Sequence, residues 1–124
     1  MFYYINLCSN NEKIILTERG TFFGYNRLVN DMTAIYTMQN LGYPVVFDAT
    51  HSTQQPGGLG QASGGSRQLA PVLARAAVAA GANALFMEVH PDPDKALCDA
   101  ASMMELDKVE SLLKVCKNIF KIVK

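Results

Sequence analysis

The sequence predicts an α/β fold in which parallel strands alternate with helices. Three short apolar runs, rich in β-branched or aromatic residues, begin at residues 14, 44 and 84. Each is followed by a stretch in which apolar residues recur at steps of three and four, the spacing of one helix face. Strands and helices that alternate in this way are typical of repeated βα units in a parallel sheet.

The composition favours a single domain over residues 1–124 and excludes several classes of partner. Hydrophobic residues make up 49% of the chain, and 11 Lys and Arg balance 11 Asp and Glu. Without clustered basic residues we expect neither nucleic-acid nor membrane partners, because such binding depends on displaced counterions. No apolar run approaches the roughly 20 residues that span a bilayer. Residues 1–8 lack the pattern of a secretory signal, so we expect a cytoplasmic protein.

The predicted strands cover residues 14–17, 44–47 and 84–87. Their apolar character is continuous rather than alternating, which indicates burial on both faces in a parallel sheet covered by helices. Three strands leave two open edges, and a closed barrel of this type needs eight strands and about 250 residues. We therefore expect the chain to be a portion of a larger protein, and residues 1–11 predict neither a strand nor a complete helix.

The predicted helices cover residues 28–36, 69–80 and 106–123. The first rests on apolar residues at helical spacing, namely Leu28, Val29, Met32, Ile35 and Tyr36. The second ends at Gly81, the usual C-terminal cap residue. The third carries its lysines on the stripe opposite its apolar residues, and those near its end suit the helix dipole.

The three cysteines match neither a disulfide framework nor a paired zinc motif, so we expect reduced thiols at Cys8, Cys98 and Cys116. We expect them to pack as small hydrophobes, with only Cys98, beside an acidic loop residue, near chemistry. The six methionines are expected to fill the core.

Polar residues follow each predicted strand, where ligands bind in parallel α/β folds. Arg19, His51 and Glu88 are expected to face a common barrel interior. The planar fork of Arg19 suits a phosphate or carboxylate, and its alternative is an ion pair with Glu18 or Asp48.

A histidine and two carboxylates form a plausible set of ligands for a divalent ion. His51 suits either a metal ligand or a proton carrier, with Glu88 and Asp99 as the carboxylates. The alternative is a structural histidine held by packing and a backbone hydrogen bond.

Two loops stand out. The glycine-rich residues 53–65 predict either a mobile lid or a disordered surface loop, and without a Walker lysine or a GxGxxG opening they do not indicate nucleotide binding. Two prolines in residues 90–94 exclude a helix there, and we expect Asp92 and Asp94 to be solvated.

At these positions the sequence closely resembles the 3-deoxy-D-manno-octulosonate 8-phosphate synthases, also called 2-dehydro-3-deoxyphosphooctonate aldolases. The resemblance lies in LTERGTFFGYN at residues 16–26, in VFDATHS at residues 46–52 with the glycine-rich loop that follows, and in FMEVHPDP at residues 86–93 through Asp99. It runs from about residue 11 to about residue 113. Members of this family are more than twice as long, so only the last three units of a (β/α)8 barrel are expected here.

The resemblance implies condensation of phosphoenolpyruvate with D-arabinose 5-phosphate, with release of phosphate, in the pathway to the lipopolysaccharide inner-core sugar. It implies that Arg19 holds the phosphoenolpyruvate phosphate and that His51, Glu88 and Asp99 ligate a divalent Mn, Zn or Fe. His51 and Asp99 are the implied catalytic residues, since Asp99 can also move protons. The family also implies a homotetramer.

Two departures from the family pattern bear on these roles. The fourth metal ligand, a cysteine on the first barrel strand, has no counterpart here, and metal-independent members carry asparagine in its place. Residues 100–102 read Ala-Ala-Ser where metal-independent relatives often have Asp-Gly-Pro after the aspartate, which favours the metal-dependent branch. The lysines and the arginine that grip both substrates from earlier strands are also missing.

Three hypotheses follow. The chain is part of a synthase that works when the remaining strands are supplied, or it is a non-catalytic truncated remnant that is inactive alone. A third reading, a phosphate-binding α/β module, rests on Arg19 alone.

Overall fold

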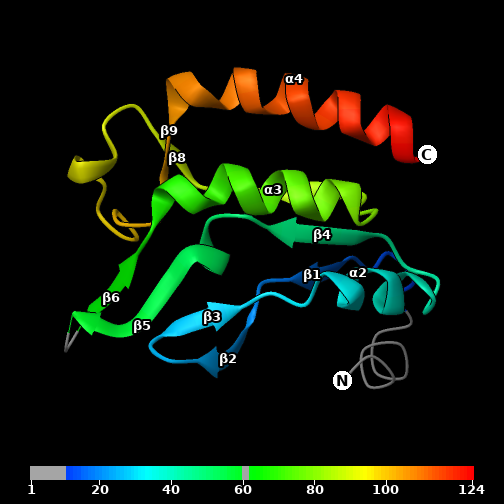
Figure 1. The fold of residues 1–124 in the computed structure, drawn as a ribbon, viewed down its shortest axis with the longest axis horizontal. Coiled ribbons are helices and arrows are strands. Elements are labelled where there is room, and N and C mark those ends of the chain that lie inside the picture. The colour runs from blue at the N-terminus through cyan, green and yellow to red at the C-terminus, as the bar shows by residue number, and fades with distance from the viewer. Residues whose placement is uncertain (1–10, 60–61) are drawn as a thin grey trace.

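The structure, a computed structural model, describes residues 11–59 and 62–124, so predictions for Cys8 and the first ten residues lie outside it. Its central sheet has three parallel strands in the order β1 (Leu16–Glu18), β4 (Val45–Asp48) and β7 (Ala84–Phe86). All three predicted strands are confirmed, each within two residues of its expected start. Figure 1 shows the sheet with helices α3 and α4 layered beside it.

The register of the sheet brings the carboxyl ends of its strands together. Glu18 lies opposite Phe47, and Asp48 lies opposite Phe86. Burial on both faces is confirmed for β4 only. In β1 and β7 it is wrong, because each of these strands pairs with β4 and with no other described strand, which leaves part of it exposed.

The core lies between this sheet and helices α2 (Met32–Gln39), α3 (Ala70–Ala79) and α4 (Leu106–Val123). The bounds of α4 match the prediction, because its apolar stripe persists over the whole helix. Helix α3 buries mainly small side chains, namely three alanines and Val78, so its backbone can approach the sheet closely. The expected cap is also confirmed, since Gly81 has a φ of 103° just beyond the end of α3.

The predicted helix over residues 28–36 is partly wrong. Leu28 and Val29 belong to strand β3 (Arg27–Val29), which pairs with β2 (Thr21–Gly24) in an antiparallel hairpin. Asn26 makes the turn with a φ of 51°, a conformation that asparagine tolerates better than most residues. Helix α2 begins only after Asp31, whose carboxylate accepts a hydrogen bond from the backbone N–H of Thr33.

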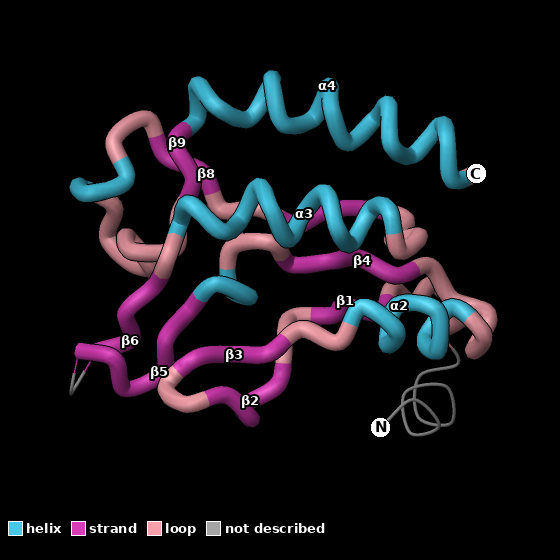
Figure 2. The backbone as a smooth tube through the Cα atoms, in the orientation of Figure 1, coloured by secondary structure: helices cyan, strands magenta, loops and turns pink. Residues whose placement is uncertain are grey.

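The glycine-rich segment is also more regular than predicted. Strands β5 (Gln54–Leu59) and β6 (Ala62–Gly65) form an antiparallel hairpin instead of an irregular loop. Its close packing against the backbone of Ala101 and Ser102 is possible because residue 65 has no side chain. Figure 2 shows this hairpin and the β2–β3 hairpin beyond the carboxyl end of the central sheet.

The remaining elements are short. Strands β8 (Val89–His90) and β9 (Met104–Glu105) pair in parallel, and 3-10 turns cover His51–Thr53 (η1), Arg67–Leu69 (η2) and Pro93–Lys95 (η3). The sequence predicted no helix around the two prolines; the described residues there form no α-helix, but the single 3-10 turn η3 begins at Pro93.

The acidic side chains of this region are solvent-accessible, as predicted, and both also form ion pairs at the surface. Asp94 forms an ion pair with Arg67, and Asp92 forms one with Lys95 at 2.6 Å.

Methionines 103 and 104 are buried, as expected of core residues. Of the two described cysteines, both free, Cys116 is buried in the core as predicted, but Cys98 is exposed, so its predicted packing is wrong. Among the described residues, every helix is too short or too polar to cross a bilayer.

Candidate metal and anion site

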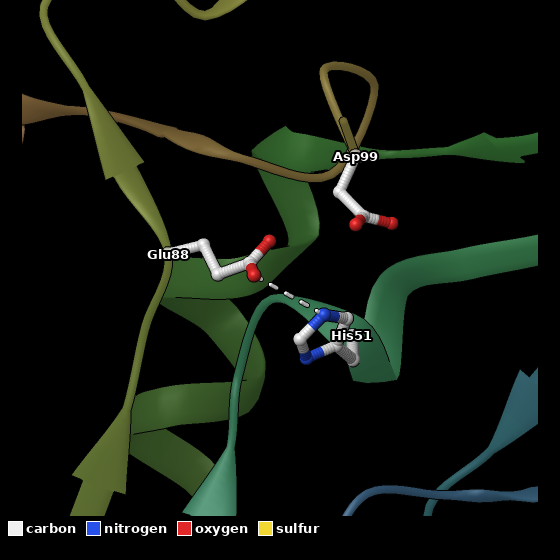
Figure 3. A group of neighbouring side chains, drawn as sticks. All are labelled: His51, Glu88 and Asp99. Atoms are coloured by element: carbon white, nitrogen blue, oxygen red, sulfur yellow. Dashed lines mark ion pairs between the residues drawn. The ribbon is translucent and has the colours of Figure 1, made fainter. Parts of the chain in front are cut away.

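Three separate segments bring together His51, Glu88 and Asp99, the three residues that the sequence analysis grouped as candidate ligands of a divalent ion. His51 opens the turn after β4, Glu88 lies between β7 and β8, and Asp99 lies between η3 and β9. One ligand atom from each side chain lies within 4.8 Å of the others. Figure 3 shows the three side chains converging from these separate segments.

A buried carboxylate fixes the orientation of the His51 ring. Asp48 is only 5% exposed, and its Oδ2 lies 2.6 Å from His51 Nδ1. The backbone N–H of His51 donates to the other oxygen of Asp48 at 3.0 Å. A carboxylate can only accept, so Nδ1 carries the proton, and in the neutral ring the lone pair lies on Nε2. The Phe86 ring stacks on the imidazole, with centroids 5.8 Å apart.

The Nε2 atom of His51 faces Glu88 Oε1 at 3.5 Å. A lone pair facing a carboxylate needs either a proton or a cation between them. Glu88 Oε2 is buried and has no hydrogen-bond partner among the described residues. A buried unpaired carboxylate oxygen is rare in proteins and is satisfied when a cation binds it. These features fit a divalent ion.

Thr50 connects the end of β4, which precedes His51, to the segment after β7 that carries Glu88. Its buried hydroxyl donates to Asp48 Oδ1 at 3.3 Å and accepts from the backbone N–H of Glu88 at 3.2 Å. The Thr50 hydroxyl therefore holds the segment that presents Glu88 at the end of β4, and it also bonds the carboxylate that orients His51.

Asp99 adopts an unusual backbone conformation, with a φ of 50°. Its carbonyl oxygen accepts hydrogen bonds from the backbone N–H groups of Ser102 and Met103 at 2.9 and 3.0 Å. Non-glycine residues with positive φ are uncommon and cluster at functional sites. These bonds hold the left-handed turn that presents the Asp99 carboxylate.

Arg19 lies outside the group of three but is connected to it. Its Nη2 donates to Gln54 Oε1 at 2.9 Å, and Gln54 Nε2 donates to Asp99 Oδ1. The alternative ion pairs of Arg19 are not formed: the Glu18 carboxylate accepts from the backbone of Gly20, and Asp48 is engaged by His51. Within residues 11–59 and 62–124, Arg19 has no acidic partner.

Sequence reasoning missed Asp48, Thr50 and Gln54 as parts of this site. A carboxylate three residues before a histidine, at the end of a buried strand, is the signal that could have revealed Asp48. Gln54 gave no comparable signal, because its role depends on a hairpin that the sequence did not predict.

Cys98 lies beside the site, as its position next to Asp99 suggested. Local desolvation, together with the negative charges of Asp99 and Glu88 and a hydrogen bond with Asp99, raises the pKa of its thiol. The thiol form therefore persists to higher pH than in an isolated cysteine.

Parallel strands with helices between them and polar groups at their carboxyl ends define a partial (β/α)8 barrel. Residues 2–124 match the model of the DAHP synthetase I family, and the chain belongs to that family. Over 106 residues it is 64% identical to a 2-dehydro-3-deoxyphosphooctonate aldolase of Nitratidesulfovibrio vulgaris strain DP4, covering 86% of this chain and 39% of the relative.

Two further comparisons agree with this family. A 2-dehydro-3-deoxyphosphooctonate aldolase of Geobacter sulfurreducens is 57% identical over 118 residues, which cover 95% of this chain and 43% of the relative. The crystal structure of a phospho-2-dehydro-3-deoxyheptonate aldolase from Thermotoga maritima superposes with a TM-score of 0.79 at 32% identity, covering 97% of this chain and 33% of that one. The chain thus spans about two fifths of the length of the curated relatives it matches, and the resemblance noted in its sequence is confirmed.

Proposed function

We propose that this chain provides the phosphate-binding and metal-binding end of a 3-deoxy-D-manno-octulosonate 8-phosphate synthase. That activity joins phosphoenolpyruvate to D-arabinose 5-phosphate, releases phosphate and serves lipopolysaccharide inner-core synthesis. The observation that carries the proposal is the convergence of His51, Glu88 and Asp99 beside Arg19, in a chain 64% identical to a relative named for this reaction.

Arg19 is the proposed ligand of the phosphoenolpyruvate phosphate. Its guanidinium group is exposed and has no acidic partner in the described part of the chain, so it remains able to take an anion. A planar fork of N–H donors suits a phosphate, whose oxygens can accept two bonds at once.

His51, Glu88 and Asp99 are the residues that would hold a divalent Mn, Zn or Fe. The unpaired buried oxygen of Glu88 and the lone pair of His51 Nε2 support this assignment. When bound, such an ion supplies a Lewis acid that polarises a carbonyl or orients a water. Asp48 keeps the His51 ring in the tautomer that a metal ligand needs.

The chain's own groups supply proton transfer in this proposal. The carboxylate of Asp99 is the acceptor for the proton of the water that adds to C2 of phosphoenolpyruvate. His51 is the second catalytic group, because its ring faces the same space and an imidazole can both accept and donate a proton.

Substrate positioning requires residues beyond these 124. We propose that strands from the rest of a full-length barrel, in a homotetramer, complete the site. Positioning of two reactants contributes several kcal/mol to such reactions, so three strands alone should lose most of the rate.

Phosphate release, measured with phosphoenolpyruvate and arabinose 5-phosphate, tests the proposal. The chain is assayed alone and with a fragment carrying the missing strands of the Nitratidesulfovibrio relative, with Mn²⁺ or Zn²⁺ and after chelation. We expect release that needs both substrates and the added fragment, and loss of release on chelation identifies the metal-dependent branch.

Two variants and a control make this assay specific. Arg19→Ala should weaken the use of phosphoenolpyruvate, whereas Arg75→Ala, an exposed arginine on α3, should not. His51→Ala should reduce metal retention. If the folded chain and the added fragment associate without releasing phosphate, the alternative of a non-catalytic remnant is correct.

A further inference from the structure

We propose that Gln54 is a positioning residue that links Arg19 to Asp99, so that the anion-binding and metal-binding halves of the site depend on each other. This inference rests on the proposed function, because it assigns to Gln54 a role between an anion ligand and a metal ligand.

The contacts of Gln54 define a chain of two hydrogen bonds. Its Oε1 accepts from Arg19 Nη2 at 2.9 Å, and its Nε2 donates to Asp99 Oδ1 at 2.5 Å. A guanidinium group can only donate and a carboxylate can only accept, whereas an amide offers one group of each kind. The amide orientation is therefore fixed, since a flipped amide would set donor against donor at Arg19 and acceptor against acceptor at Asp99.

Asp99 is the ligand whose side chain depends on this link. The ring of His51 is fixed by Asp48, and the backbone of Glu88 is fixed by Thr50. For Asp99 the backbone bonds from Ser102 and Met103 hold only its carbonyl group. Among the described residues, two groups contact the carboxylate itself: the thiol of the adjacent Cys98, a weak donor, and the amide of Gln54, which lies on a separate element. The hydrogen bond from Gln54 is therefore the strong restraint that keeps the carboxylate facing the other two ligands.

For the removal of the Arg19 charge, the link predicts a change in cation affinity opposite to the one that simple electrostatics predicts. Removal of the Arg19 charge should strengthen cation binding nearby, because it removes a repulsion. If Arg19 instead orients the amide that orients Asp99, its removal should weaken cation binding. That weakening should require Gln54.

Gln55 provides a matched control one residue along the chain. Its Nε2 donates to Ser66 Oγ at 3.2 Å, at the base of the β5–β6 hairpin. Its substitution therefore removes an amide of the same size and a hydrogen bond of similar kind without touching the Arg19–Asp99 link.

The test is the affinity of the full chain for Mn²⁺ alone, without substrates, measured by electron paramagnetic resonance of the free ion. We expect Gln54→Leu to bind Mn²⁺ about tenfold more weakly, as is usual for partners that orient a metal ligand, and Gln55→Leu to bind normally. Arg19→Ala should weaken binding when Gln54 is present and have no further effect in the Gln54→Leu background. Circular dichroism checks the fold of each variant.

The outcomes separate this inference from the proposed function. If the wild type binds Mn²⁺ and Gln54→Leu binds it equally well, the link is wrong while the metal site stands. A wild type that binds no Mn²⁺ overturns both. If Gln54→Leu does not fold, Arg19→Ala decides alone: weaker binding supports the link, and tighter binding overturns it.

Discussion

At the scale of single residues, the site depends on a carboxylate that would not itself touch a ligand. Asp48 is buried, holds Nδ1 of His51 and leaves Nε2 facing Glu88. Carboxylates in this arrangement increase the basicity of a histidine ligand and select its tautomer. The chemistry available to His51 is thus set three residues earlier in the sequence, at the end of β4.

We expect Asp48→Asn to reduce Mn²⁺ affinity by about 10- to 100-fold, because the neutral amide neither polarises the ring nor requires a proton on Nδ1. Isothermal titration calorimetry measures the change. Asp92→Asn is the control, since Asp92 pairs with Lys95 at the surface and should leave affinity unchanged. Equal affinities for all three proteins would mean that the Asp48–His51 contact is purely structural.

Asp31 offers a second prediction at this scale, on stability. Hydrogen bonds from the side chain and backbone of Thr33 lower the pKa of its carboxyl, outweighing the opposing effect of desolvation. A carboxyl whose pKa is lower in the folded state stabilises the fold above its ordinary pKa and loses that effect as the pH falls through the lowered value.

Asp31→Asn should therefore show a smaller loss of unfolding free energy below about pH 4, while staying near wild type at pH 7, because asparagine also caps helices well. Urea denaturation at a series of pH values measures this. Asp31→Ala should be less stable than both at pH 7. Identical pH profiles for wild type and Asp31→Asn would show that the cap carries no charge-dependent stability.

How far the sequence predicts the site is also decided at single residues. Arg19, His51 and Glu88 were predicted because ligands bind at the carboxyl ends of the strands in a parallel fold, and Asp99 was predicted as a second carboxylate for a divalent ion. Asp48 was considered only as an ion-pair partner for Arg19, and no role was predicted for Gln54. Amides and hydroxyls acquire their roles from three-dimensional contacts between distant segments, which no local pattern encodes.

At the scale of elements, prediction succeeded where one pattern persisted and failed where two patterns overlapped. Helix α4 (Leu106–Val123) repeats its apolar stripe over 18 residues and was located at its bounds. Leu28 and Val29 continue the helical spacing of α2 by coincidence, although they belong to a hairpin that closes at Asn26. The β5–β6 hairpin was not predicted, because glycine has no side chain and a glycine-rich segment therefore lacks the apolar–polar alternation that indicates a strand.

The β5–β6 hairpin packs against the segment that follows Asp99, and the contact is made by Gly65. A Cβ atom on this residue would lie 2.9 Å from the carbonyl carbon of Ala101 and 3.0 Å from Ser102 N. Both neighbours are backbone atoms, so they can yield only if the segment that carries Asp99 moves.

Gly65→Ala should cost about 1–3 kcal/mol of unfolding free energy through this overlap and should weaken Mn²⁺ binding as Asp99 shifts. Gly42→Ala is the control: its φ of 86° makes alanine strained, but no atom lies within 4 Å of the added Cβ, and it lies outside the site. Both variants should lose stability, yet only Gly65→Ala should lose affinity. Unchanged Mn²⁺ affinity in Gly65→Ala would mean that the packing of the hairpin does not position Asp99.

At the scale of the whole molecule, the central sheet has an open edge on each side among the described strands. Strands β1 and β7 each have an edge that pairs with no described strand, and Phe86 on β7 is 46% exposed. In a complete barrel such edges pair with neighbouring strands and such side chains are covered. The chain therefore presents the candidate ligands His51, Glu88 and Asp99 on a surface that a complete barrel would enclose.

The ligand residues also connect parts of the chain that are far apart. His51, Glu88 and Asp99 follow β4, β7 and η3, so a bound cation would join the sheet to the segment that leads into α4. The unfolded chain does not bring these groups together. Binding should therefore stabilise the folded state as a whole rather than one loop.

Mn²⁺ at 100 times its dissociation constant should add about 2.7 kcal/mol to the free energy of unfolding. For a domain of this size that is a rise in Tm of roughly 10 °C, which differential scanning calorimetry resolves. EDTA should reverse the rise, and His51→Ala should abolish it without lowering the Tm of the metal-free protein by a similar amount. Replacement of His90, whose Nδ1 accepts from the backbone of Asp92, by alanine should leave the rise intact, because that ring lies outside the ligand group. If the Tm does not change at Mn²⁺ concentrations that saturate binding, the ion binds outside the group of His51, Glu88 and Asp99, on side chains that are equally available in the unfolded chain.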